Sequence, residues 1–543
     1  MPSEPLRFVS RPTPRSGHTT KKPSDFRVLI VYPNLMGMLV PPLSVAIFTA
    51  ILRKAGYEVA LFDSTPYMTD DTSSPAKRSQ YLQTRKFSYE KDIQITPRFD
   101  LTEDFVSMFE GFKPDLMVVS CVEDTFRQAV RLIQSTADRG IPTLLGGVFP
   151  TAAPEVALSY DGIDLVAVQE GEAVLAEVAE RVRHGADLSD VPGLWLKRAD
   201  GTIIRNPSGP LVDINLTQPD FSLFDKSRFN RPMGGRVFRS VPIETYRGCP
   251  YKCTFCNSPM QVSMSKESGQ GLFLRRKTMD TLRAELRHMV DQYDPEFVYI
   301  VDDSFLARSE AEVLAFAEMY KEFRLPFWFN TRPENVTPRR LEAMREAGCY
   351  RISFGLEHGN ETFRKKVLQR HPTNEQILEQ FEMIAQSGIA FSVNNIIGFP
   401  DETRELIFET IEFNRQLHGY DTLTVSIFTP YHGTALREVA VGKGYLDRDA
   451  LTTHTMSSSM LRMPTLSAEA IDGLARTFTL YVELPKSLWP LIEQAERFDE
   501  EGQRTFEALS EKFAKSLGQD QFSRRRDTDW EMVFGHMSKV QIR

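Results

Sequence analysis

Short apolar runs alternate with amphipathic stretches in the first third of the chain. Apolar runs predict strands at 26–33, 59–62, 115–120, 143–145 and 164–168, and the amphipathic stretches predict helices at 43–55, 124–139 and 171–183. Strands alternating with helices indicate a parallel, doubly wound sheet. Ligands of such sheets lie beyond the carboxyl ends of the strands, here loops 33–42, 120–124, 146–151 and 169–172. The segment 64–101 interrupts the pattern, and nothing in its sequence places it.

A second series of six strand–helix units follows. Its strands are predicted at 242–246, 297–301, 327–330, 350–354, 391–397 and 423–428. Six such units predict a partial (β/α)6 barrel with an active site at the carboxyl ends of its strands. The fold class is therefore α/β: a Rossmann-like domain over 26–190, a linker over 191–238, a partial barrel over 239–446 and a C-terminal helical extension over 447–543. The proline-rich residues 1–25 predict a disordered tail.

Composition narrows the function classes. The net charge of −8 argues against broad binding of nucleic acid, which needs a basic face. No apolar run approaches the ~20 residues that a membrane-spanning helix requires. Five cysteines in 543 residues suit a reducing compartment, so we expect a cytoplasmic protein without disulfides.

Three of the five cysteines form the motif Cys-x-x-x-Cys-x-x-Cys at Cys249, Cys253 and Cys256. A structural zinc site would need a fourth ligand, and no second cysteine pair or histidine pair follows at the usual distance. Three thiolates instead suit a 4Fe-4S cluster that keeps one iron open for a substrate. The isolated Cys121 and Cys349 are expected to be small buried residues.

The cysteine motif, with the aromatic Phe255 before its third cysteine, resembles the signature of the radical S-adenosylmethionine (SAM) superfamily. The resemblance implies that SAM binds the open iron and that polar strand ends contact it. It assigns Glu357 to the SAM ribose or amino group and the backbone at Phe255 and Ile397 to adenine. The same resemblance places Asp302 and Asp303 near the SAM methionine moiety or the substrate, and it suggests that Arg332 pairs with a carboxylate. Where relatives carry Pro-Gly-Thr after the sixth strand, this chain has His432-Gly-Thr, which is either neutral or places His432 near the substrate.

The first third resembles the cobalamin-binding domain found upstream of many radical SAM cores. It lacks the Gly-x-Gly-x-x-Gly of dinucleotide-binding domains. Instead it carries the family's Gly-Gly-x-x-Pro-Thr, Pro-Glu and Gly-Glu loops, which the resemblance assigns to cobalamin: Gly146, Gly147, Pro150, Thr151, Pro154, Glu155, Gly171 and Glu172. No histidine occurs between Phe26 and Arg183. If cobalamin binds here, we therefore expect no histidine of this domain on its cobalt.

Together the two resemblances imply a cobalamin-dependent radical SAM methyltransferase that acts on an unactivated carbon or on phosphorus of a small molecule or natural product. Its cofactors would be a 4Fe-4S cluster, SAM and cobalamin, and an electron donor such as flavodoxin or ferredoxin would be its partner. Two alternatives stay open: a cyclase or rearrangement enzyme with the same cofactors, and a metal-binding scaffold without catalysis. A methylthiotransferase acting on transfer RNA is disfavoured, because Cys121 is the one cysteine before the motif.

Overall fold

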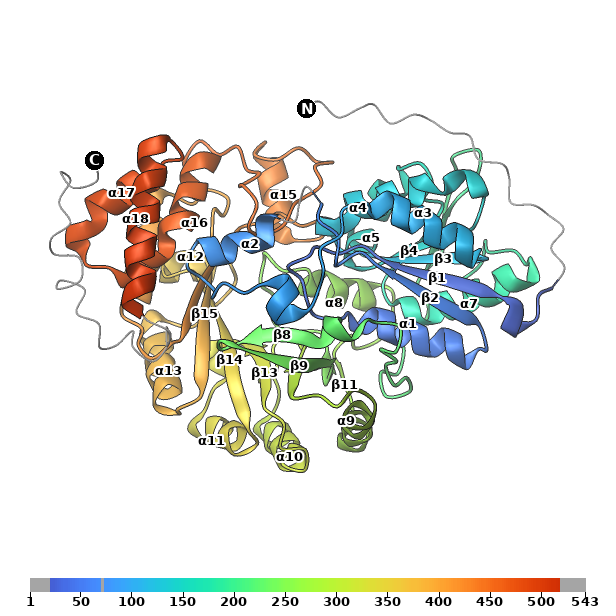
Figure 1. Ribbon diagram of the computed structural model, residues 1–543, viewed down its shortest axis with the longest axis horizontal. Helices are drawn as coiled ribbons and strands as arrows, with labels where there is room; N and C mark the ends of the chain where they lie inside the picture. Colours follow the sequence, from blue (N-terminus) through green and yellow to red (C-terminus); the bar gives the residue numbers. More distant parts are fainter. Residues whose placement is uncertain (1–19, 70–72, 518–543) are drawn as a thin grey trace.

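The computed structural model describes residues 20–69 and 73–517 and contains two seven-stranded sheets (Figure 1). The first sheet has the strand order β2-β1-β3-β4-β5-β6-β7. Its five parallel strands are β1 (Arg27–Tyr32), β2 (Glu58–Asp63), β3 (Leu116–Ser120), β4 (Thr143–Gly146) and β5 (Leu165–Ala167). The predicted doubly wound sheet is confirmed.

Alternate residues of β1, an interior strand of the first sheet, face two different cores. Val28 and Ile30 belong to the core that also contains residues of α1 (Leu43–Lys54) and α7 (Gly171–His184). Leu29 and Val31 belong to a second core, which contains residues of α3 (Leu101–Phe112) and α4 (Glu123–Ser135). Because both faces are covered, the strand is apolar throughout and not alternating.

The segment after α7 extends the first sheet. The strands β6 (Leu194–Lys197) and β7 (Ile203–Arg205) form a hairpin around Asp200, and β6 pairs antiparallel with β5. The expected linker over 191–238 therefore begins with two strands of the first sheet and ends with β8 (Asn230–Met233) and part of β9 (Arg236–Ile243) of the second.

The second sheet has the order β16-β15-β14-β13-β12-β9-β8, and all but β8 run parallel. The further strands are β12 (Phe297–Ile300), β13 (Phe327–Thr331), β14 (Cys349–Glu357), β15 (Ala390–Ile397) and β16 (Thr422–Ile427). This open sheet confirms the predicted partial barrel. Its first strand, β9, begins and ends earlier than predicted, and a two-residue strand, β10 (Tyr246–Arg247), follows it.

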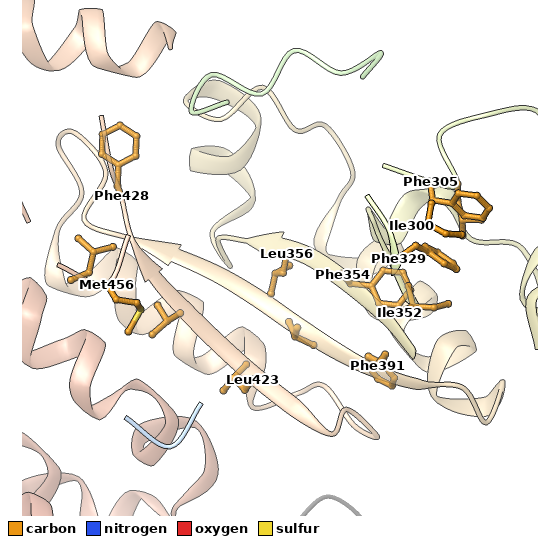
Figure 2. Close-up of a cluster of buried hydrophobic side chains, with 14 of the residues drawn as sticks. Ile300, Phe305, Phe329, Ile352, Phe354, Leu356, Phe391, Leu423, Phe428 and Met456 are labelled. Atoms are coloured by element: carbon orange, nitrogen blue, oxygen red, sulfur yellow. The ribbon is translucent and has the colours of Figure 1, made fainter. Parts of the chain in front are cut away.

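Helices cover the outer face of the second sheet, among them α9 (Met279–Tyr293), α10 (Glu310–Tyr320), α11 (Pro338–Glu346), α13 (Asn374–Gln386) and α14 (Arg404–Asn414) (Figure 1). Side chains cap two of these helices: the Thr337 side chain accepts from the amide of Arg340 at the start of α11, and Thr373 and Gln376 form a capping box at α13. Figure 2 shows part of the buried core, including Ile352 and Phe354 of β14 and Phe391 of β15.

The segment that the sequence left unplaced bridges the open side of the partial barrel. Gln83 Oε1 accepts from the amide of Val425 on β16, at 3.3 Å. At the opposite edge of the sheet, Asn230 Nδ2 on β8 donates to the Ile93 carbonyl at 2.9 Å. The segment 64–101 therefore spans the gap between the two edge strands and contributes a wall to the barrel interior.

The C-terminal region begins with an irregular stretch over 447–467 and not with a helix. It continues as α16 (Ala468–Glu483), α17 (Trp489–Ala495) and α18 (Glu500–Leu517). Arg415 fixes α16 to the barrel by donating to the carbonyls of Tyr481, Val482 and Leu484, which end that helix. Among the described residues, none of the helices combines the length and the apolar character needed to cross a bilayer. Residues 1–19 of the expected disordered tail, and residues 518–543 of the expected helical region, lie outside the described ranges.

Candidate functional site

The cysteine motif forms a loop between β10 and α8 (Ser258–Glu267). Gly248, at the start of the loop, has a φ of +95°, and a Cβ there would meet the Phe273 ring at 2.9 Å. Thr254 in the middle of the loop is held by its hydroxyl, which donates to the Val367 carbonyl at 2.6 Å, and by its own carbonyl, which accepts from the amide of Leu436 at 3.0 Å. Segments that follow β14 and β16 therefore fix the loop at the carboxyl ends of the strands.

The three thiols of the loop are free and partly accessible, whereas Cys121 and Cys349 are buried, as expected. Burial raises the pKa of Cys249 to about 11 and that of Cys256 to about 12. Such thiols keep their protons near neutral pH unless a bound cation stabilises the thiolates. Soft thiolates from one short loop are the donor set of an iron–sulfur cluster, so these residues fit one. Within 20–69 and 73–517, no three Cys, His, Asp or Glu side chains are grouped as a site for a single metal ion.

Asp302, at the end of β12, positions the start of the cysteine loop. Its carboxylate accepts from the amides of Thr245 and Tyr246 at 2.8 and 3.1 Å, and pairs with Arg308 at 2.6 Å. The Thr245 hydroxyl is a further donor. Burial raises the pKa of Asp302, although Arg308 opposes the shift. With this many donors around it, Asp302 orients the chain that leads to Cys249, and its contact with SAM or substrate stays a prediction.

Asp303 lies in a different environment from its neighbour. It is solvent-exposed, and its carboxylate accepts from the Ser258 hydroxyl at 2.7 Å, two residues beyond Cys256. The protein surrounding the carboxylate withdraws part of its hydration and raises its pKa. Asp303 therefore presents a carboxylate beside the cysteine loop in a position open to a ligand.

Glu357 is the last residue of β14, at a β-bulge where the pairing with β15 shifts. Its φ of +70° belongs to the left-handed region, which non-glycine residues rarely adopt. The carboxylate folds back over Gly355 and accepts from Arg370 Nη1 at 2.9 Å. Burial raises the pKa of Glu357, and the guanidiniums of Arg370 and Arg332 counteract it. Strained backbone at a strand end is frequent at functional sites.

Arg332 lies between Glu357 and the cysteine loop. Its Nη1 is 4.0 Å from Cys253 Sγ, its guanidinium lies 3.8 Å from the centre of the Tyr251 ring, and it forms an ion pair with Glu334. The carboxylate partner expected for Arg332 is therefore, in this structure, a side chain of the protein itself. Burial raises the pKa of Cys253, and the positive charges of Arg370 and Arg332 oppose that rise.

The two residues expected near adenine lie at the same mouth of the barrel. The Phe255 and Phe399 rings are 6.0 Å apart. Ile397 is buried at the end of β15, and its carbonyl accepts from the amide of Phe428. The turn that follows is held by the buried Glu402, which accepts from the amides of Gly398 and Phe399 and pairs with His358. Contact of Phe255 and Ile397 with adenine stays a prediction.

In the glycine-rich loop of the first domain, the second glycine, Gly147, occupies a position that no larger residue fits. Gly147 has a φ of +124°, and a Cβ there would meet the Cys121 carbonyl oxygen at 2.0 Å. Gly146 ends β4, and its carbonyl accepts from the amide of Cys121. Pro150 and Thr151 lie in the short helix α5 (Val148–Ala152), and the Thr151 hydroxyl accepts from the amide of Gln169 at 3.0 Å. The predicted ligand loops after β3, β4 and β5 are thus joined to one another.

Exposed apolar side chains mark the same edge of the first sheet. Met38, Val122 and Val148 are 36%, 41% and 38% exposed, and they come from the loops after β1, β3 and β4. Exposed apolar residues that gather on ligand-binding loops indicate a surface that a partner or a ligand covers. Whether these loops contact cobalamin itself stays a prediction.

An ion-pair network joins this edge to the cysteine loop. Arg247, two residues before Cys249, pairs with Glu170 and Glu172 of the loop after β5, both at 2.8 Å, and with Glu244 at 2.9 Å. Glu170 also pairs with Arg275. Burial alone would raise the pKa of Glu170, but the guanidiniums of Arg275 and Arg247 hold this pKa below its ordinary value. Glu172, expected at the cobalamin pocket, is thus an ion-pair partner of the cysteine loop.

A second contact joins the two domains through His432. Glu123, at the start of α4, accepts from the Nδ1 of His432 at 2.7 Å and from the amides of His432 and Thr452, both at 2.9 Å. The Nε2 of His432 is buried, and no residue in the described part of the chain forms a hydrogen bond with it. Because protein covers that nitrogen, this structure places His432 in a contact between domains and not on a surface open to substrate. Burial alone would raise the pKa of Glu123, but His432 holds it below its ordinary value.

The sequence analysis did not single out Arg247, Arg370 or Glu123 as functional residues. The one local signal was for Arg247, which stands in the motif Arg-Gly-Cys-Pro itself. Arg370 and Glu123 act through partners that are distant in sequence, and a single sequence does not reveal such pairs.

The network predicts an acid-sensitive stability. Because the folded-state pKa of Glu170 lies below its ordinary value of 4.5, its contribution is complete above that pH and is lost as the pH falls through the folded-state pKa. We expect the thermal midpoint of the protein to fall on acidification below about pH 4.5, and Glu170→Gln to lower the midpoint at pH 7 and to flatten this dependence.

Glu103→Gln, on the exposed face of α3, serves as the control and should leave the profile unchanged. Parallel profiles for wild type and Glu170→Gln would show that the carboxylate at residue 170 does not stabilise the fold.

Comparison with known proteins identifies both domains. Residues 35–179 match the B12 binding domain, and residues 243–413 match the radical SAM superfamily. An uncharacterised methyltransferase of Pyrococcus horikoshii is 26% identical to this chain, and the match covers 71% of this chain and 83% of that protein. A cytidylyl-2-hydroxyethylphosphonate methyltransferase of Streptomyces wedmorensis is 22% identical over 80% of this chain and 85% of its own. An anaerobic magnesium-protoporphyrin IX monomethyl ester cyclase of Rubrivivax gelatinosus is 26% identical over 61% and 60%, respectively.

Solved structures share the arrangement of the two sheets. The cobalamin-dependent SAM radical enzyme OxsB superposes on 94% of this chain and 75% of its own, with a TM-score of 0.62 and 15% identity. The radical SAM methyltransferase TsrM of Kitasatospora setae, with cobalamin and a 4Fe-4S cluster bound, covers 77% of this chain and 75% of its own, with a TM-score of 0.55 and 19% identity. With both domain matches in the order that the structure shows, the chain combines a B12 binding domain with a radical SAM domain, and the cofactors of these two domains are cobalamin, SAM and a 4Fe-4S cluster.

Proposed function

We propose that this protein is a methyltransferase that transfers a methyl group from SAM, by way of cobalamin, to an unactivated carbon or to phosphorus of a small-molecule substrate. The observation that carries the proposal is the contact between two ligand-binding edges. Loops after β3 and β5 of the first sheet contact the cysteine loop and the segment after β16 through Glu170, Glu172 and Glu123. A cobalamin on the first edge would therefore face SAM on the second across the substrate.

The overall reaction determines how many SAM molecules and electrons the enzyme needs for each methyl group transferred. One SAM is cleaved reductively to methionine and 5′-deoxyadenosine, with a hydrogen atom taken from the substrate, and a second SAM gives its methyl group and leaves as S-adenosylhomocysteine. The sum consumes two electrons, which we assign to a reduced flavodoxin or ferredoxin in the cytoplasm. When bound, the cluster supplies single electrons and cobalamin carries the methyl group.

The chain's own residues would orient and enclose these groups. The three cysteines would hold the cluster, and Asp302 and Arg247 set the path of the loop that carries them. Glu357 and Asp303 are carboxylates at the same mouth of the barrel, where they would orient SAM by accepting hydrogen bonds. The segment 64–101 bridges the open side of the barrel, which would help to exclude water from the reactive radical.

The similarity of this chain to known proteins supports methyl transfer but leaves one competing function open. Two of the relatives are methyltransferases by name, and one of these acts on a phosphonate. The similarity to a magnesium-protoporphyrin IX monomethyl ester cyclase favours the second candidate, a radical cyclisation or rearrangement that uses the same cofactors without methyl transfer.

Methyl transfer can be tested before the substrate is known. Reconstituted enzyme with reduced cobalamin should take the methyl group of trideuteromethyl-SAM, so that mass spectrometry finds labelled methylcobalamin together with S-adenosylhomocysteine. With a cell extract as the source of substrate, a small molecule should then acquire the labelled methyl group while 5′-deoxyadenosine forms.

Omission of the reductant is the control and should abolish both products. Formation of 5′-deoxyadenosine with an altered but unlabelled small molecule, and no labelled methylcobalamin, would contradict methyl transfer and favour the cyclase.

Glu357→Gln tests the carboxylate at the end of β14. The amide keeps the shape of the side chain and removes the charge, so we expect SAM to bind about ten-fold more weakly, which corresponds to ~1.4 kcal/mol. Equilibrium binding of SAM and the rate of 5′-deoxyadenosine formation are the measurements. Iron and cobalamin content should stay at the wild-type level.

Glu361→Gln is the matched control and should bind SAM as wild type does, because this partly exposed carboxylate of α12 (Glu361–Lys366) pairs with Lys365. If Glu357→Gln also bound SAM normally and formed 5′-deoxyadenosine at the wild-type rate, Glu357 would have a structural role through Arg370 alone.

A further inference from the structure

A small recess lies where the first loop of the cobalamin domain meets the barrel. Its walls are residues 39–41 of the loop after β1, residues 228, 229 and 231 at the start of the barrel, and side chains of β9 and β12, and the recess opens partly to solvent. Its enclosed part has room for about one water-sized group, so it admits a single oxygen atom of a ligand and not a whole substrate.

One wall of the recess carries a buried guanidinium that is only partly satisfied. Arg228 is 2% exposed, donates through Nε to Asp63 at 2.6 Å and through Nη1 to the Leu39 carbonyl at 2.7 Å. Among the described residues, no partner lies within hydrogen-bond distance of its buried Nη2. A buried donor of a charged group costs free energy unless it finds an acceptor, so this nitrogen favours an acceptor from beyond the described residues.

A second guanidinium faces the same recess. Arg231, on β8, lies 4.9 Å from the centre of the Tyr299 ring and 4.7 Å from that of Trp328, and these two rings stack on each other at 4.3 Å. Burial lowers the pKa of Arg231. The aromatic rings hold the guanidinium in place without neutralising it. Among residues 20–69 and 73–517, no carboxylate forms an ion pair with it.

The charges therefore do not balance. Two guanidiniums line the recess, and among the described residues Asp63 is the one carboxylate that pairs with either of them. Two acidic residues act electrostatically on Tyr299: Asp302, which pairs with Arg308, and Asp303, which accepts from Ser258. An oxyanion is the ligand that two convergent guanidiniums recognise best.

A further guanidinium adds positive charge within the barrel. Arg78, in the segment that bridges the open side, donates to the Gln83 side chain and to the Ser426 hydroxyl on β16, both at 3.0 Å. Both of these partners are neutral. Burial lowers the pKa of Arg78 to about 10, a value at which it still carries its charge near neutral pH.

We infer that the recess at Arg228 and Arg231 binds an oxyanion group of the substrate, either a carboxylate or a phosphate or phosphonate. The inference deepens the proposed function and rests on it for the statement that the ligand is the substrate. Strand β9 leads from the recess to the cysteine loop, and residues 39–41 belong to the loop beside the expected cobalamin. A substrate anchored here would extend into the space between the two cofactors.

Binding of simple oxyanions tests the inference without turnover. Isothermal titration calorimetry of the fully loaded enzyme, with cluster, cobalamin and SAM, is carried out with inorganic phosphate, methylphosphonate and propionate. At least one probe should bind with a dissociation constant in the millimolar range, as expected for so few atoms. The preferred probe distinguishes a phosphorus oxyanion from a carboxylate.

Three variants assign the binding to the recess. Arg231→Met removes the charge and should weaken binding at least ten-fold, whereas Arg231→Lys should retain part of it. Ser240→Asp places a carboxylate in the recess next to the guanidiniums and should abolish binding, and it also decides the question if Arg231→Met does not fold. Arg131→Met, an exposed arginine of α4, is the matched control and should bind as wild type does.

Equal affinity of wild type, Arg231→Met and Ser240→Asp for every probe, or no binding by wild type, would overturn the inference. If the enzyme without cobalamin bound a probe and the loaded enzyme did not, the recess would belong to the phosphodiester of cobalamin itself. This result would also overturn the inference. Because no methyl group is transferred in these titrations, their outcome is independent of the labelled-methyl experiment, and failure of one is distinguishable from failure of the other.

Discussion

The arrangement of the site depends on the charge network around Arg247. This side chain stands at the entrance of the cysteine loop and pairs with carboxylates from both domains, Glu244 on its own side and Glu170 and Glu172 on the other. A partly buried arginine with several acidic partners is costly to separate from them, because each charge would then have to be hydrated or remain unpaired. The network thereby couples the path of the cysteine loop to the position of the first domain.

The rest of the site follows from the geometry of parallel sheets. The carboxyl ends of the strands in each sheet carry the loops, and the two sheets meet with these loops in contact. Asp302 and Glu402 are buried carboxylates that bind backbone amides and so fix the loop after β9 and the turn after β15. Glu357 and Asp303 lie at the same mouth of the barrel, and backbone donors do not satisfy all of their carboxylate oxygens. The structure thus separates residues that position loops from residues that can meet a ligand.

The sequence predicted the features that depend on local pattern. The apolar periodicity placed both sheets, and the cysteine spacing indicated the cluster, because neither needs a partner far along the chain. It did not reveal that Asp302 is held by Arg308 and Thr245, or that Glu357 pairs with Arg370, since these contacts form only when the barrel closes. The role of residues 64–101 was hidden for the same reason: their partners on β16 and β8 are brought together by the whole fold.

The central claim is that Cys249, Cys253 and Cys256 hold a 4Fe-4S cluster beside a separate cobalamin domain. The most direct measurement is the iron and cobalamin content of anaerobically reconstituted wild type and of the variant with all three cysteines changed to alanine. The account predicts about four irons and one cobalamin per wild-type chain, and a variant that loses the iron but keeps the cobalamin. A variant that retained its iron would contradict the account.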